Sequence, residues 1–210
     1  MGVKVTTQND LEEQHRILTF WFGEDPSSPE LVKQRQKIWY TGGEKIDQTI
    51  RENFNEVYEH AANETLLHWA ETARGALALV ILLDQFSRNL FRGTSGAFAQ
   101  DPMARAVAKR ALNLGLDREI SIPGRIFLLH PFHHSEELVD QLFGCDRLRD
   151  LIDEGHDEWH EMLDSSVEWF DGHMDVVKRF SRFPHRNKVL GRESTEEEAA
   201  FLAESSGFGQ

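Results

Sequence analysis

Apolar residues recur at helical spacing along most of the chain, whereas the two-residue alternation of β-strands is nearly absent. Asp101-Pro102 is a helix-opening signal, and Gly115 ends the apolar pattern that follows it. From about residue 44 to residue 62, the apolar positions share one stripe of a helix: Ile46, Ile50, Phe54, Val57 and Tyr58. The pattern predicts an all-α protein of about nine helices joined by short loops.

The most hydrophobic segment, residues 76–83, consists of eight consecutive apolar residues. A helix that is apolar on every side must be surrounded by other helices, so we expect it at the centre of the core. It continues without a Gly or Pro into a dense polar group: Asp84, Gln85, Arg88, Asn89 and Arg92. Asp84 and Arg88 are one turn apart and can pair on one face. Because a buried ion pair is a weak source of stability, the group predicts either a ligand pocket or a network that holds helices in register.

Local signals predict further helix ends. Residues 123–130 should form one or two helical turns that end at Pro131, because the residue before a proline is disfavoured in the α region. Ser135 can cap the helix that follows. Thr195 and Glu198 have the spacing of a capping box and predict a last helix. No linker-like segment interrupts the chain, so we expect one all-α domain over residues 1–210.

Length and cysteine content act mainly by exclusion. A chain of 210 residues can bury a sizeable core without covalent cross-links. The single cysteine, Cys145, excludes an intramolecular disulfide framework and favours the reducing cytoplasm, where we expect the protein to reside. The longest apolar run is far shorter than the roughly 20 residues of a membrane-spanning helix, so no membrane partner is expected.

The charge of the chain excludes another class of partner. A formal net charge of −13 repels a phosphate backbone, so no nucleic acid is expected as a partner. The segment from Val176 to Arg192 differs, because it holds six basic residues and no acidic one. Such a cationic island is either an anion site or a contact for the protein's own acidic surface.

Four blocks resemble the signature of one family: LTFWFG at 18–23, LLDQFSRNLFRG at 82–93, PFHHSEE at 131–137, and HMDVVKRFSRFPHRNKVLGRESTEEE at 173–198. In this order, and over nearly the whole chain, they are similar to a bacterial family called domain of unknown function 924. The resemblance implies a tetratricopeptide-like fold of antiparallel helical hairpins stacked in a short solenoid, and it implies no reaction. The family pattern usually has methionine in place of His133, which makes His133 a poor candidate for an essential group.

Two of these blocks combine arginine with asparagine. The guanidinium fork suits carboxylate or phosphate, and an asparagine amide can donate and accept. We expect the blocks to meet around one pocket for a small anionic molecule. The expected ligand-binding residues are Asp84, Arg88, Asn89, Arg182, His185, Arg186 and Asn187, with His173 beside the apolar stripe of its helix. The other interpretation is that these side chains are braces between helices.

Proton transfer in such a pocket would fall to His134 or Glu136, with Arg88 and Arg186 as the charge clamp. Whether the protein is an enzyme stays open. His156 and His160 have a chelating spacing but lack the glutamate of an HExxH motif, so we interpret them as surface residues. No metal is expected, because the histidines of the family blocks are not at chelating spacing. No cofactor is expected either, and no glycine-rich phosphate loop accompanies the arginines to indicate a nucleotide.

An alternative function is an interaction scaffold, in which a solenoid groove holds a peptide and the polar clusters are structural braces. An open groove lined by Trp21, Trp39 and Trp69 would favour the scaffold, and a closed cavity where the blocks converge would favour the pocket. The sequence does not indicate the ligand, the reaction or the oligomeric state.

Overall fold

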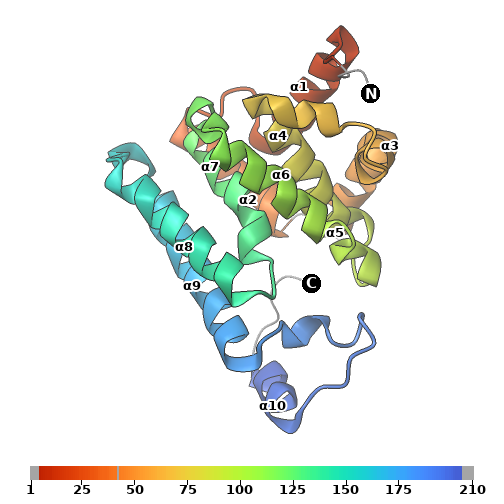
Figure 1. Ribbon diagram of the computed structural model, residues 1–210, viewed down its shortest axis with the longest axis vertical. Helices are drawn as coiled ribbons and strands as arrows, with labels where there is room; N and C mark the ends of the chain where they lie inside the picture. Colours follow the sequence, from red (N-terminus) through yellow and green to blue (C-terminus); the bar gives the residue numbers. More distant parts are fainter. Residues whose placement is uncertain (1–4, 42, 205–210) are drawn as a thin grey trace.

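The computed structural model describes residues 5–41 and 43–204, which are helical with no β-strand among them (Figure 1). The α-helices are α1 (Gln8–Phe22), α2 (Pro29–Thr41), α3 (Gly43–Ala62), α4 (Ala73–Val80), α5 (Ser87–Leu90), α6 (Asp101–Asn113), α7 (Ile122–His133), α8 (Leu138–Asp153), α9 (His160–Phe180) and α10 (Glu196–Glu204). Short helices complete the path: η1 (Leu67–Glu71), η2 (Ile81–Phe86), η3 (Ser95–Phe98), η4 (Leu116–Glu119), η5 (Asp157–Trp159) and η6 (Pro184–Arg186). The prediction of an all-α fold is confirmed.

The centre of the fold is the continuous rod formed by α4, η2 and α5, residues 73–90. The segment 76–83 lies inside it, and none of its side chains is more than 5% exposed. Helices α1, α3, α6 and α7 pack around the rod. The predicted burial of this segment is confirmed. When the rod is counted once, the described α-helices make nine separate helical segments, close to the expected number.

The rod is not a regular α-helix, because η2 is a π-helical turn. The sequence predicts a plain helix here and gives no sign of the wider turn. A π-turn changes the angular spacing of the side chains on either side of it. In this rod it lies between α4, in which every residue except Arg74 is buried, and the half that carries Arg88.

Helix α7 continues through Pro131, which corrects the expected end of the helix before that residue. Proline removes one backbone hydrogen bond and costs about 3 kcal/mol in a helix interior. Every residue of α7 is buried. We attribute the continuation to this burial, which restrains the backbone from both sides.

Helices α7, α8 and α9 lie side by side, and the chain then turns under them into η6 and α10 (Figure 1). The predicted capping box at α10 is confirmed, since Thr195 N donates to Glu198 at 2.8 Å and Glu198 N donates to Thr195 at 3.2 Å. Ser135 does not cap α8, whose N-cap residue is Glu137. The hydroxyl of Ser135 instead accepts from Glu137 N and donates to Asp140. None of the described helices is both long and apolar enough to cross a membrane.

Candidate functional site

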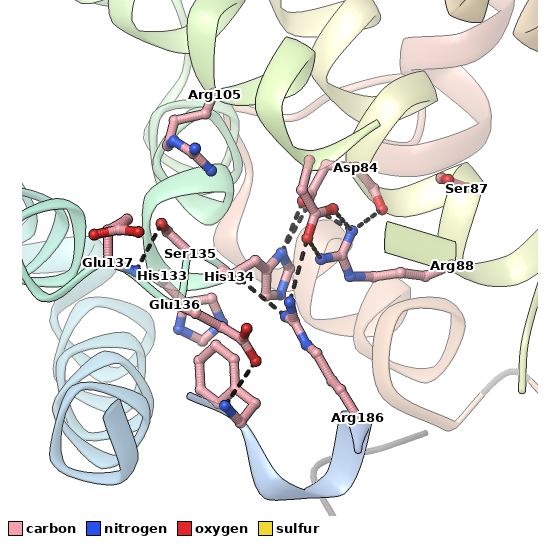
Figure 2. Close-up of polar contacts among 12 residues, drawn as sticks. Asp84, Ser87, Arg88, Arg105, His133, His134, Ser135, Glu136, Glu137 and Arg186 are labelled. Carbon is pink, nitrogen blue, oxygen red and sulfur yellow. Dashed lines mark hydrogen bonds and ion pairs between the residues drawn. The ribbon is translucent and has the colours of Figure 1, made fainter. Parts of the chain in front are cut away.

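The carboxylate of Asp84 is the buried centre of a polar network at the end of the apolar rod (Figure 2). It lies 3.0 Å from Arg88 Nη1 and 2.5 Å from Gln85 Nε2, and His134 Nδ1 contacts it at 2.8 Å. The predicted pairing of Asp84 with Arg88 is confirmed. Because every one of these partners can donate, the carboxylate is fully used on the protein side.

A second carboxylate, Asp101, joins the two arginine blocks. Arg88 lies 3.0 Å from Asp101 Oδ1, and Arg186 Nη1 lies 3.4 Å from Asp101 Oδ2. Arg186 Nη2 also donates to the backbone carbonyl of His134, the C-cap residue of α7, at 2.9 Å. The expected meeting of the two arginine blocks is therefore confirmed at Arg88 and Arg186, and Figure 2 shows both directed toward His134. The sequence gives Asp101 only as a helix start and not as part of a site.

The guanidinium of Arg186 lies between two aromatic rings, with the Phe98 centroid at 4.4 Å and the Phe183 centroid at 4.6 Å. Such stacking holds the planar group in one orientation. Burial, followed by the nearby charge of Arg88, lowers the pKa of Arg186 to about 10. The group is still a cation at neutral pH.

The contact with Asp84 sets the tautomer of His134. An ionised carboxylate only accepts hydrogen bonds, so Nδ1 carries the proton and Nε2 is left as an acceptor. No other described residue hydrogen-bonds Nε2. Burial, followed by Arg88, holds the pKa of His134 well below its usual range. The ring is therefore neutral near pH 7, with the unshared electron pair on Nε2.

Further histidines gather beside His134. The His133 ring lies 4.5 Å from that of His134 and 4.0 Å from that of His173, measured between centroids. Burial lowers the pKa of His173 to about 4 and that of His185 to about 3. His133 is fully buried, and neither of its ring nitrogens has a hydrogen-bond partner among the described residues. Within the same residues, no group of three or more potential ligands has the geometry to hold a metal ion.

These groups border a cavity of about 190 Å³, which we call the cationic cavity. Its lining residues are Trp21, Trp39, Gln85, Arg88, Asn89, Arg92, Phe127, His130, His134, Trp169, His173, His185 and Arg186. Three of them are arginines, four are histidines and none is acidic. Two nitrogen atoms of these residues, Trp21 Nε1 and Arg186 Nε, are buried behind the wall and have no partner within the described part of the chain. The wall therefore offers mainly hydrogen-bond donors and aromatic rings.

Several predicted site residues lie outside this cavity. Glu136 accepts from Phe183 N and pairs with Arg192 at 2.7 Å. Burial raises its pKa, but the hydrogen bonds from Arg192 and Phe183 N, together with the charges of Arg192 and Arg186, outweigh this and keep the pKa below the usual value. Glu136 is thus an acceptor already in use outside the cavity, so this arrangement gives no support to its expected proton-transfer role.

The block at residues 173–198 also contains residues that line the cavity and residues that do not. Arg182 binds Glu198 at 2.6 Å, and Asn187 donates to Glu198 and to Ser194. These contacts hold α10 against the turn that precedes it, so Arg182 and Asn187 are braces. Asn89 lines the cavity, although its amide donates to Asp47 at 2.7 Å.

An open groove lined by Trp21, Trp39 and Trp69, which would favour the scaffold alternative, is not formed by these described residues. Trp21 and Trp69 are each 1% exposed, so they are core residues. Trp69 donates its indole N–H to Asp10 at 2.9 Å. His156 and His160 lie at the surface as expected, with partners on their own turn of the chain.

Comparisons with known proteins agree with this architecture. The model of a family described as "Bacterial protein of unknown function (DUF924)" matches residues 17–206. The solved structure of a protein of unknown function from Agrobacterium tumefaciens is similar, with 34% sequence identity and a TM-score of 0.79. The match covers 93% of this chain and 99% of that one. No curated protein matches the sequence.

Proposed function

Because the chain belongs to DUF924, a bacterial family whose description names no activity, we propose a function from the site itself. The cationic cavity binds a small carboxylate monoanion. The observation that carries this proposal is the lining, which contains three arginines and no acidic side chain. A guanidinium group suits a carboxylate, because it presents several N–H donors in one plane.

The charge behind the cavity wall favours a monoanion over a dianion. Each lining arginine has a carboxylate partner outside the lining: Asp84 and Asp101 for Arg88, Asp101 for Arg186, and Asp47 for Arg92. The three cations are thus matched by three carboxylates. A ligand carboxylate would contact the guanidinium side of these pairs and would add one net negative charge, whereas a dianion would add two and cost more to desolvate.

Acid/base chemistry in this cavity falls to His134. Asp84 holds its ring in one tautomer, as the carboxylate does in a catalytic histidine–carboxylate pair. Its unprotonated Nε2 is suited to remove a proton from a bound molecule, and a neighbouring guanidinium is suited to stabilise the negative charge that develops. This is proton-transfer chemistry carried by the chain's own residues.

The family resemblance implies a tetratricopeptide-like arrangement of the helices, which we include in the proposal. The neighbouring helices α7, α8 and α9 support a tetratricopeptide-like stack of hairpins. The scaffold alternative has less support, since Trp21 and Trp69 are buried in the core. The free, buried thiol of Cys145 supports a cytoplasmic location.

The test is thermal unfolding at pH 7.5 with acetate, propionate, succinate or phosphate. A ligand that binds only the folded state adds about 2.7 kcal/mol of stability at 100 times its Kd. We expect the monocarboxylates to raise the melting temperature and the dianions to have a smaller effect. Arg186→Gln should abolish the shift, and Arg149→Gln, which breaks an exposed pair with Asp171, should retain it. Absence of a shift with every monocarboxylate contradicts the proposal.

A further inference from the structure

A second cavity of about 290 Å³ adjoins the cationic cavity, and we call it the apolar cavity. Its lining residues are Gln36, His130, Met162, Ser165, Ser166, Trp169 and Phe170. His130 and Trp169 line both cavities. The two spaces therefore share one boundary, between α7 and α9.

The polar residues of the apolar cavity have little hydrogen-bonding capacity to offer. Ser165 Oγ donates to the carbonyl of Glu161 at 2.8 Å, and Ser166 Oγ donates to that of Met162 at 2.7 Å. Both hydroxyls are thus used by their own helix. His130 Nδ1 is similarly bonded to its own helix, at the carbonyl of Ile126, at 2.9 Å.

Apart from the side-chain amide of Gln36, what remains in this lining is an apolar surface. The thioether of Met162 and the rings of Trp169 and Phe170 offer no strong hydrogen-bonding group except the Trp169 N–H. The His130 ring stacks on Phe127 with the centroids 4.4 Å apart, so its flat side is also occupied. The two cavities therefore differ in chemistry on the two sides of one boundary.

We propose that the ligand is a carboxylate with an unbranched apolar tail, whose head lies in the cationic cavity and whose tail lies in the apolar cavity. This inference rests on the proposed carboxylate site and adds the class of molecule that binds there. We infer an apolar tail because the two cavities adjoin. The apolar cavity lies next to the groups that would bind the carboxylate, and it is larger than the cationic cavity. His134 then faces the first carbons of the ligand rather than its tail.

The experiment is a calorimetric titration of the whole chain at pH 7.5, which measures the Kd of acetate, butanoate, hexanoate and octanoate. Burial of a methylene group contributes enough to tighten Kd by about fourfold per carbon. We expect this gain to continue along the series until the apolar cavity is full. Hexan-1-ol is the matched control ligand, and without a carboxylate it should bind far more weakly than hexanoate.

Ser166→Leu places a larger side chain in the apolar cavity and should remove the dependence of Kd on chain length. Asp164→Leu also places a leucine on α9, at an exposed residue that lines neither cavity. This control should retain the dependence of Kd on chain length. Thermal unfolding of both variants verifies that they are folded. The wild-type series tests the inference even if a variant does not fold.

Two results overturn the inference and leave the carboxylate site in place: an affinity that does not change from acetate to octanoate, or a length dependence that persists in Ser166→Leu. A series in which no member binds contradicts the carboxylate site itself, and with it this inference.

Discussion

Arg88 and Arg186 are far apart in the sequence, and both contact the carboxylate of Asp101. Asp101 is 7% exposed, and burial raises its pKa even though both cations oppose this. A buried carboxylate that loses one cation retains the other. The stability of the network therefore depends on the arginines jointly.

We predict that Arg88→Gln and Arg186→Gln are non-additive. Each single variant should lose about 2–4 kcal/mol of unfolding free energy, and the double variant should lose at least about 1 kcal/mol more than the sum, because it leaves Asp101 without a cation. Urea denaturation at pH 7.5 measures all three. The control pairs Arg186→Gln with Arg149→Gln, whose partner is Asp171, and should be additive. Additivity of the first pair would show that the two arginines act independently.

His133 is predicted to destabilise the fold. Its two ring nitrogens are buried without partners, which costs about 1–3 kcal/mol. His133→Met, the residue usual in the family pattern, removes both nitrogens and should raise the unfolding free energy by about 1–2 kcal/mol. His133→Gln keeps a polar group in the same place and should give no gain. Equal stability of the methionine variant and the wild type would indicate that the imidazole is satisfied in solution.

Stability should fall as the pH is lowered from 7 to 5. Burial lowers the pKa of His173 to about 4 and that of His185 to about 3, whereas the unfolded chain takes up these protons near 6.5. The unfolded state therefore binds more protons in this window, and each of these histidines removes about 2 kcal/mol by pH 5. Urea denaturation at both pH values measures the loss.

The matched variant for this pH dependence is His173→Asn, which should reduce the loss between pH 7 and pH 5 by the share of one histidine. Acidic groups such as Glu154, whose pKa is lowered to about 2 chiefly by a hydrogen bond from Arg125, titrate well below this window. Equal unfolding free energy at pH 7 and pH 5 in the wild type would contradict the neutral state of the buried histidines.

Asp84 is predicted to set the tautomer of His134. Ring nitrogen chemical shifts from NMR should show the proton on Nδ1 in the wild type. In Asp84→Asn, the amide oxygen should turn to Arg88 and its NH₂ group to the ring, which moves the proton of His134 to Nε2. Asp47→Asn alters a carboxylate that contacts Arg92 and Asn89, and it should leave the His134 tautomer unchanged. A proton on Nε2 in the wild type would remove the basis for the proposed proton acceptor.

The helical pattern and the burial of residues 76–83 could be predicted from the sequence because both follow from local periodicity. The pairing of Asp84 with Arg88 could be predicted for the same reason, since the two are one helical turn apart. Asp101 could not, because an aspartate before proline is also the ordinary start of a helix. The pairing of Glu136 with Arg192 could not be predicted either, because Arg192 comes from a distant segment whose path no local signal fixes.

Helix α7 shows the other limit. A proline is a strong local signal, and the prediction of a break at Pro131 followed it. The outcome depends on the neighbours of α7 in space, which bury all of its residues. Tertiary packing thus outweighed the local preference of proline. The energetic cost of a proline in a helix is known, but the packing around α7 cannot be read from the sequence.

The π-turn at η2 gives the site a tolerance to one change in the length of the chain. Such a turn contains one residue more than an α-helical turn, so deletion of a single apolar residue within Ile81–Phe86 would let the rod close as a regular α-helix. Because the wide turn already absorbs the extra residue, the two halves of the rod would keep nearly their present orientation, and Arg88 would still face Asp101. A one-codon deletion at this turn is thus a change of chain length that the site can absorb, with every charged residue still encoded.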